Sequence, residues 1–171
     1  NNKEKILGVP VIGPLSILEK YKNKEMYVFL TIGDNKLRKE ISENQLLNNF
    51  THTNIVHPLS NVDKSAKLGL GNYVGPFANI GPEVKLGFQN IVNTNVDIEH
   101  ETKIGNFCHL APNSTIGGRC IIGNQTLIGA NATILEKMRI ADKTIIGASS
   151  FVNKDVLEPN QTLVGSPCKP I

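Results

Sequence analysis

Aliphatic residues recur at every sixth position over most of the chain. The series runs from Val56 to Val152 without a break or a frame shift, and every member is valine, isoleucine or leucine. A helix repeats every 3.6 residues and a strand every two, so neither accounts for this period. The pattern predicts short strands joined by tight corners, with each strand sending one aliphatic side chain inward.

Small residues accompany the aliphatic series. Glycine often follows the aliphatic residue, as at Gly105 and Gly117, and we expect it to ease the bend at a corner. Three hexads make one 18-residue coil of a triangular prism, and successive coils stack through backbone hydrogen bonds at about 4.8 Å. The fifth position of the hexad, expected to fill the interior, is mostly small: Ala66, Ala78, Thr102, Cys108, Ser114, Cys120, Thr126, Ala132, Thr144 and Ser150.

The segments on either side lack this period. Residues 1–55 combine helical patterns at 14–21 and 36–50 with an apolar run at 26–33, which predicts a partial α/β unit with a parallel sheet. Residues 158–171 contain three prolines and are expected to leave the prism and fold back along its side or across its end. The predicted organisation is therefore 1–55, 56–157 and 158–171.

The tripeptide Gly33-Asp34-Asn35 follows the apolar run and has a turn and helix-cap sequence. Ligands of parallel sheets bind beyond the carboxyl ends of the strands. The tripeptide is therefore either a plain capped loop or part of a ligand site. The cations that follow, Lys36, Arg38 and Lys39, share their stretch with two glutamates, which favours a solvated helix face.

Composition and charge argue against a nucleic-acid-binding, membrane or secreted protein. The formal net charge of +3 is spread along the chain, so neither a nucleic-acid partner nor a membrane partner is expected. No apolar run approaches the roughly 18 residues of a membrane span, and no signal peptide is recognisable. The three cysteines form no CxxC pair, which favours reduced thiols in a cytoplasmic protein.

Residues 99–109 carry polar side chains that the repeat does not require. His100 is third in its hexad, near an outward-facing corner, and one coil of 18 residues places Gly118 beside it. A carboxylate next to a histidine holds one ring nitrogen and raises the basicity of the other, and both Glu99 and Glu101 are candidates. The N–H of Gly118 is suited to an oxyanion, which makes acyl transfer with a histidine base a testable hypothesis.

Several motifs together resemble one family. HPLSNV, EHETKIG, FCHLAP, IGANATIL, IIGASSFVNKDV and LVGSPCKP are similar to those of bacterial acetyl-CoA-dependent sugar acetyltransferases, the sialic-acid O-acetyltransferase and nucleotide-amino-sugar N-acetyltransferase group. The resemblance implies a left-handed parallel β-helix that forms a homotrimer, preceded by a small α/β domain for a nucleotide sugar. The family's opening strand and Gly-rich turn are missing, so we expect a truncated form.

The resemblance also implies a reaction and a set of roles. The expected function is N-acetylation of a 4-amino nucleotide sugar in surface-glycan biosynthesis, without a metal, and O-acetylation of sialic acid or another sugar is the alternative. The implied roles are catalysis for His100 and Glu101, acetyl-CoA binding for His109, Gly118, Ala130 and Ala148, and acceptor binding for Gly33, Asp34 and Asn35.

Two other classes share the prism. A γ-class carbonic anhydrase needs three zinc ligands in a fixed geometry, and its His-x4-His pair is missing among His52, His57, His100 and His109. A non-catalytic solenoid typically shows identical outward residues in ladders, whereas the outward positions here vary irregularly. Both alternatives are disfavoured.

Overall fold

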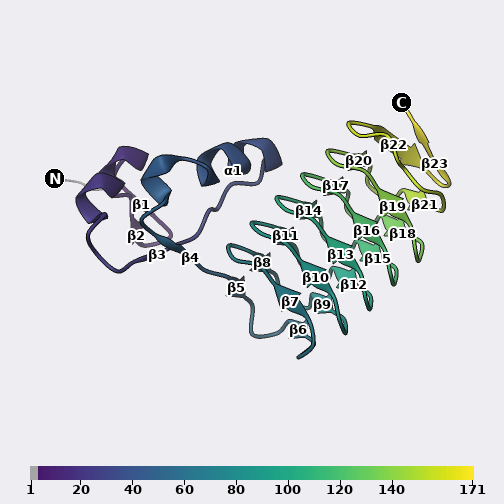
Figure 1. Cartoon of the computed structure of the whole chain (residues 1–171), viewed down its shortest axis with the longest axis horizontal. Helices are drawn as coiled ribbons and strands as arrows, with labels where there is room; N and C mark the ends of the chain where they lie inside the picture. Colours follow the sequence, from purple (N-terminus) through teal and green to yellow (C-terminus); the bar gives the residue numbers. More distant parts are fainter. Residues whose placement is uncertain (1–3) are drawn as a thin grey trace.

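The computed structural model describes residues 4–171. It is mainly β: a left-handed parallel β-helix forms a three-faced prism, and an N-terminal part with the helical segments lies beside it (Figure 1). Within residues 4–171 no helix is both long and apolar enough to cross a membrane.

Three sheets, parallel in every pair except β22 with β23, form the faces of the prism. The eight-stranded face contains β5 (Ile55–Val56), β8 (Tyr73–Val74), β11 (Ile91–Val92), β14 (His109–Leu110), β17 (Leu127–Ile128), β20 (Ile145–Ile146), β22 (Thr162–Gly165) and β23 (Cys168–Pro170). The six-stranded face contains β6 (Asn61–Val62), β9 (Asn79–Ile80), β12 (Asp97–Ile98), β15 (Thr115–Ile116), β18 (Thr133–Ile134) and β21 (Phe151–Val152). The five-stranded face contains β7 (Lys67–Leu68), β10 (Lys85–Leu86), β13 (Lys103–Ile104), β16 (Ile121–Ile122) and β19 (Arg139–Ile140).

The sequence period sets the register of these sheets. From β5 to β21 each strand residue pairs with the residue 18 positions later, as Ile98 does with Ile116. The aliphatic residue of each hexad points inward and is buried from Val74 to Val152, and the small fifth residues such as Thr102 and Cys120 are buried with it. The predicted prism, its 18-residue coil and its small inner positions are therefore confirmed.

The glycines that follow the aliphatic residues do not form the bends of the corners, contrary to the expectation from the sequence. The left-handed backbone conformation falls on the third residue after the aliphatic, where Glu101 has a φ of 60° and Arg119 a φ of 61°. Gly105 is not among the residues with positive φ. A Cβ at Gly105 would lie 2.9 Å from the backbone nitrogen of Asn124 in the next coil. Glycine is needed there because neighbouring coils approach closely, not because the chain bends.

The N-terminal part is built from short elements. It contains an antiparallel hairpin of β1 (Lys5–Ile6) and β2 (Val9–Pro10), the 3₁₀ helices η1 (Leu15–Tyr21) and η2 (Gln45–Leu47), α1 (Asn35–Ser42), β3 (Tyr27–Val28) and β4 (Thr51–His52). Strands β3 and β4 pair in parallel across α1, as predicted for an α/β unit. The helix expected over 36–50 instead breaks, and the Asn44 side chain caps η2 by accepting from the Leu46 N–H.

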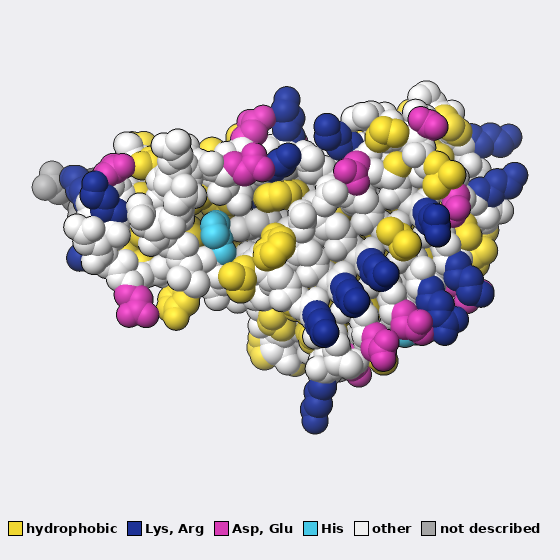
Figure 2. Space-filling view, viewed as in Figure 1, with side chains coloured by type: hydrophobic (Ala, Val, Ile, Leu, Met, Phe, Trp, Pro, Cys, Tyr) yellow, Lys and Arg dark blue, Asp and Glu magenta, His cyan; other side chains and the backbone are white. Residues whose placement is uncertain are grey.

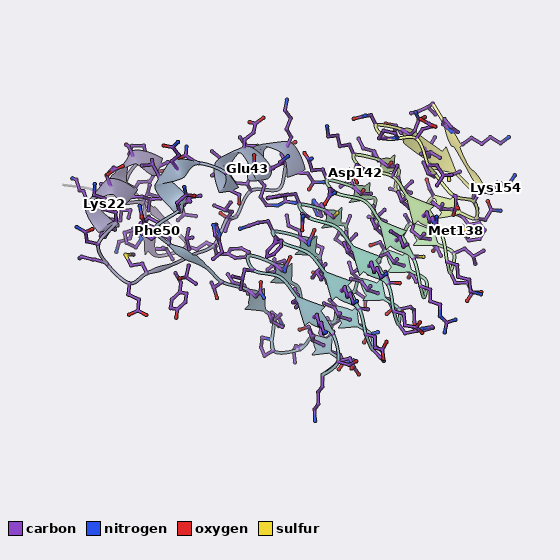
Figure 3. All side chains as sticks on the ribbon, in the orientation of Figure 1. Lys22, Glu43, Phe50, Met138, Asp142 and Lys154 are labelled. Atoms are coloured by element: carbon purple, nitrogen blue, oxygen red, sulfur yellow. The ribbon has the colours of Figure 1, made fainter. Side chains whose placement is uncertain are left out.

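Two separate hydrophobic cores support these parts. Leu30, Leu47 and Phe50 form the core of the N-terminal part, while the aliphatic columns form that of the prism. Figure 3 shows Phe50 in the first and Met138, which packs against the second, well apart along the molecule. Each part therefore has apolar packing of its own.

The tail closes the end of the prism. Instead of leaving the prism, β22 pairs in parallel with β20 and extends the eight-stranded face. Strand β23 then folds back antiparallel on β22. Leu163 is buried against the core in a place equivalent to the aliphatic columns, which explains why the segment stays on the prism.

Candidate active site

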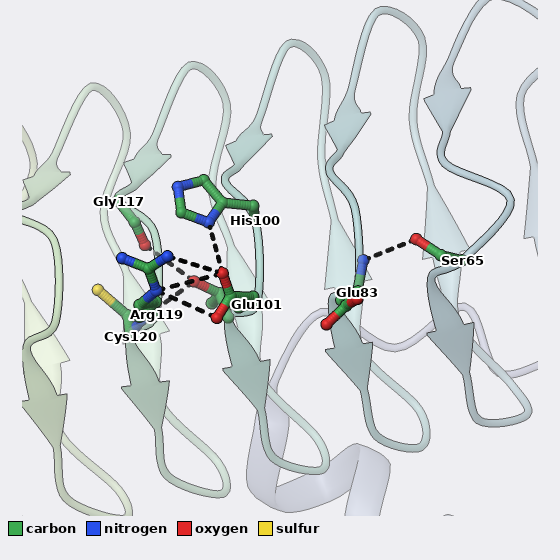
Figure 4. A network of polar contacts seen from close by, with 8 residues as sticks. Ser65, Glu83, His100, Glu101, Gly117, Arg119 and Cys120 are labelled. Atoms are coloured by element: carbon green, nitrogen blue, oxygen red, sulfur yellow. Dashed lines mark hydrogen bonds and ion pairs between the residues drawn. The ribbon is translucent and has the colours of Figure 1, made fainter.

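A polar network lies on the edge between the six-stranded and five-stranded faces. His100 and Glu101 occupy the corner between β12 and β13, and Arg119 occupies the equivalent corner one coil later. His100 Nδ1 lies 3.3 Å from Glu101 Oε1 (Figure 4). The guanidinium of Arg119 donates to both oxygens of Glu101, with Nη2 to Oε1 at 2.9 Å and Nε to Oε2 at 3.1 Å.

These contacts fix the charge of the carboxylate. The hydrogen bonds from Arg119 and, next, the contact with His100 hold the pKa of Glu101 below its ordinary value. An ionised Glu101 at Nδ1 favours the tautomer that carries its proton there and leaves Nε2 as the basic nitrogen. The three side chains thus form a chain from Arg119 through Glu101 to a histidine with a free basic nitrogen.

The imidazole of His100 lies over Gly118, as the 18-residue spacing predicted. A Cβ at Gly118 would lie 2.6 Å from His100 Nε2 and 2.9 Å from Cε1. Glycine at this position therefore makes room for the ring. The backbone N–H of Gly118 donates to no other group among the described residues. A free N–H beside a basic nitrogen is an arrangement that suits a developing oxyanion.

The sequence left open which glutamate serves His100. The structure places Glu101 in contact with His100, whereas Glu99 makes its hydrogen bond through the backbone, from its N–H to the Ile116 carbonyl. Arg119 was missed altogether. It is 18 residues after Glu101, so the coil spacing that located Gly118 would also have located it.

His109 lies apart from this network. It belongs to β14 on the eight-stranded face, between Ile91 and Leu127 in register. Its Nε2 is buried without a hydrogen-bond partner among the described residues. Burial lowers the pKa of His109, the charge of Arg38 lowers it further, and a hydrogen bond to the Gly33 backbone opposes both. His109 is therefore kept neutral beneath the N-terminal part.

The other residues predicted to bind acetyl-CoA are divided between two edges. Gly118 lies beside His100. Ala130 and Ala148 are one coil apart, as their spacing predicted, on the edge between the eight-stranded and six-stranded faces, where the Ser149 N–H donates to the Ala130 carbonyl. One chain therefore does not bring these residues to a single place.

A cavity of about 660 Å³ lies between α1 and the eight-stranded face. Its lining includes the predicted acceptor residues and cations of both parts: Gly33, Asp34, Asn35, Lys36, Lys39 and Lys143. Asp34 Oδ1 caps α1 by accepting from the Leu37 N–H at 2.7 Å. The Asn35 side chain donates to the Gln125 and Thr126 carbonyls. The tripeptide is thus both a helix cap and a cavity wall.

Arg38 corrects the sequence interpretation of a solvated helix face. Lys36 and Lys39 are on that face, but Arg38 is only 1% exposed. Its guanidinium donates to the carbonyls of Gln89 and Cys108 in the prism. It also donates to three oxygens of the N-terminal part, the carbonyls of Ile32 and Gly33 and the side chain of Asn35. Arg38 therefore fastens the cavity loop to the prism.

Replacing Arg38 with methionine is expected to destabilise the chain by about 2–4 kcal/mol, because five oxygens lose their donor and the bonds to the Gln89 and Cys108 carbonyls are buried. Denaturant unfolding measures this loss. Lys39→Met on the exposed side of the same helix is the matched control and should change stability by less than about 0.5 kcal/mol. Equal losses in the two variants would show that the buried hydrogen bonds of Arg38 do not hold the two parts together.

No group of three histidine, cysteine, aspartate or glutamate side chains within residues 4–171 is placed to hold a metal ion. The cysteines are free, and burial raises the pKa of Cys108 to about 12. The Cys108 thiol therefore stays protonated and belongs to the packing of the prism.

Solved structures resemble the fold of this chain over nearly its whole length. PerB from Caulobacter crescentus, solved with CoA and GDP-perosamine, is 30% identical with a TM-score of 0.92, over 97% of this chain and 80% of that one. The acetyltransferase domain of PglB from Neisseria gonorrhoeae FA1090, solved with acetyl coenzyme A, is 26% identical with a TM-score of 0.94, over 100% and 83% of the two chains. WeeI from Acinetobacter baumannii AYE, at 22% identity and a TM-score of 0.90 over 98% and 81%, shares the fold. No family model and no curated protein matches the sequence.

Proposed function

This chain belongs to the hexapeptide-repeat sugar acetyltransferases with a left-handed β-helix, and from that premise we propose that it transfers an acetyl group from acetyl-CoA to the amine of a 4-amino nucleotide sugar. As an acyltransferase it needs a base for the attacking group and a donor of hydrogen bonds for the oxyanion. The observation that carries the proposal is the His100 ring, which contacts Glu101 through Nδ1 and lies over Gly118 through Nε2.

The proposed chemistry assigns one role to each member of the network. His100 Nε2 removes a proton from the amine as its nitrogen attacks the thioester carbon. Glu101 orients the ring, and Arg119 holds Glu101. The N–H of Gly118 stabilises the oxyanion, and when the carbon–sulfur bond breaks the proton passes from His100 to the CoA sulfur. The chain's own groups thus account for every proton that moves.

The proposed oligomeric state rests on where the residues proposed to bind acetyl-CoA lie, because they are divided between two edges of the prism. Gly118 lies with His100, whereas Ala130 and Ala148 lie on another edge and His109 lies on a third surface, the eight-stranded face. A pantetheine arm that contacts Gly118 as well as Ala130 and Ala148 must lie between copies of the chain. We therefore propose a homotrimer, in which the edge carrying His100 meets the Ala130–Ala148 edge of a second copy.

The acceptor is assigned to the cavity beside α1. The cavity is large enough for a nucleotide, since small-molecule sites commonly span about 300–1,000 Å³. Its walls carry three lysines, Lys36, Lys39 and Lys143, together with the acidic Asp34, Glu40 and Glu43, so a polar ligand would find both donors and acceptors of hydrogen bonds there. PerB, which is similar over nearly the whole chain, was solved with GDP-perosamine, a nucleotide-linked sugar.

The test is release of free thiol from acetyl-CoA in the presence of defined acceptors. We expect release with GDP-perosamine or with UDP- or dTDP-linked 4-amino sugars, and mass spectrometry should find the acetyl group on the amine. Sialic acid serves as the hydroxyl acceptor in the same panel. Acetylation of sialic acid alone would replace N-acetylation with O-acetylation, and no release with any acceptor would overturn the proposal.

A further inference from the structure

The edge of the prism that carries His100 repeats one corner position in successive coils. Glu83, Glu101, Arg119 and Lys137 occupy that position at intervals of 18 residues, each with a left-handed backbone. Figure 2 shows acidic and basic side chains next to one another along an edge of the prism. Among these four residues only Arg119 and Glu101 form a salt bridge with each other. This pair brings a cation from the next coil into the proposed catalytic network.

Arg119 and His100 share one oxygen of Glu101. The guanidinium Nη2 donates to Oε1 at 2.9 Å, and His100 Nδ1 lies 3.3 Å from the same oxygen (Figure 4). Nε of Arg119 adds a contact to Oε2 at 3.1 Å, and Arg119 lowers the pKa of Glu101 more than His100 does. The carboxylate is therefore neutralised mainly by the guanidinium. A carboxylate so paired favours a charged imidazole less than a free one, and the guanidinium itself opposes a second positive charge beside it.

Other charged side chains lie near this corner without bonding to the network. They have both signs, and within residues 4–171 none of them forms a salt bridge with His100, Glu101 or Arg119. The edge that a second copy is proposed to bring here has uncharged corner residues from Pro76 to Ser149. The charged side chains on this and the neighbouring coils are Glu83, Lys85, Asp97, Glu99, Lys103, Glu136 and Lys137.

We propose that Arg119 limits the protonation of His100 and so keeps it available as a base at lower pH, an inference that rests on the proposed function. Glu101 by itself orients the ring but also favours its charged form, in which the ring accepts no further proton. Arg119 keeps the carboxylate in place and offsets part of its charge. It acts through Glu101 and is therefore a positioning residue.

The variants that test this role fit the backbone at the corner. The Arg119 N–H donates to the His100 carbonyl at 2.9 Å, a bond that does not involve the side chain. Gln125 and Lys137 occupy equivalent corners with φ of 56° and 64°. Glutamine and lysine are therefore both compatible with position 119. Arg119→Gln removes the charge, whereas Arg119→Lys keeps the charge and loses the planar fork of donors.

NMR titration of the histidine ring signals measures the effect directly, and the spectrum of His100→Ala identifies the signal of His100. In Arg119→Gln we expect the titration midpoint of His100 to rise by about 0.5 pH unit at low salt, the size typical of an exposed charge interaction. Arg119→Lys should keep the midpoint of the wild type, and Glu101→Gln should lower it. Lys137→Gln removes the same charge one coil further on, from a residue paired with Glu136, and is the matched control without a shift.

The acid side of the kcat–pH profile for acetyl transfer should move to higher pH in Arg119→Gln, together with the NMR midpoint. A midpoint that stays or falls in Arg119→Gln overturns the inference. An equal rise in Arg119→Lys or in Lys137→Gln also overturns it, because the charge at position 119 would then not be the cause. If the midpoints move as expected but the wild type acetylates no acceptor, the control of His100 by Arg119 stands and the proposed reaction is wrong.

Discussion

Replacing His100 with alanine is expected to lower kcat for acetyl transfer by about 10²–10⁴-fold, the usual contribution of a general base. The ring is partly exposed on an edge of the prism, and its side chain contacts Glu101 and Gly118, not the core. Its removal should therefore leave the melting temperature and the KM for both substrates nearly unchanged. Initial rates of thiol release together with thermal unfolding measure the two effects.

His57→Ala is the matched control for that variant. His57 lies near the first coil, and its Nδ1 accepts from the Leu59 N–H, far from the network. Its removal should leave kcat within about twofold of wild type. A His100→Ala enzyme that keeps its rate within about tenfold of wild type would remove His100 from the chemistry.

Gly118→Ala is expected to have the second largest effect on activity. The new methyl group would overlap the His100 ring, which is the free end of a side chain, so the ring moves and the backbone does not. Gly118 does not have a positive φ, so alanine fits its backbone. Misplacement of a reacting group by about 1 Å costs on the order of 10²-fold in rate. We therefore expect kcat to fall by about that factor with little loss of stability.

Replacing the neighbouring Gly117 is expected to lower stability, where replacing Gly118 lowers the rate. A Cβ at Gly117 would lie 2.6 Å from the backbone nitrogen of Glu136 in the next coil. Backbone atoms do not move aside as the His100 ring does, so Gly117→Ala should lose about 1–3 kcal/mol of stability. Kinetics and denaturant unfolding of the two variants should separate activity from stability. If Gly118→Ala lost stability instead of rate, the ring would not be the group displaced.

The prism was predictable because each strand must bury one aliphatic side chain, and this requirement repeats in the sequence. An aliphatic residue at every sixth position from Val56 to Val152, with three hexads to a coil, gives an 18-residue step, and that step placed Gly118 beside His100. The choice of Glu101 over Glu99 was not predictable from spacing. The choice depends on the left-handed backbone conformation of Glu101 at the corner. A glutamate gives no sequence signal for that conformation, because a positive φ is typical of glycine.

The junction between the two parts was beyond sequence reasoning for a different reason. Arg38 stands among exposed cations, and its neighbours in sequence indicate a solvated face. Its actual partners include the carbonyls of Gln89 and Cys108, which are 51 and 70 residues away. Backbone carbonyls carry no residue-specific signal, so nothing in the sequence marks them as the acceptors of a buried guanidinium.

The stacking of coils in steps of 18 residues has a consequence for how such a chain changes in evolution. Deleting one residue between Ile98 and Ile116 shifts every later aliphatic residue out of its column and separates Gly118 from His100. Inserting a whole coil beyond Arg119 preserves every aliphatic column and leaves the contacts among His100, Glu101 and Arg119 unchanged. Evolutionary relatives of this chain are therefore expected to differ in length by whole coils while keeping His100, Glu101, Gly118 and Arg119 in the same mutual positions.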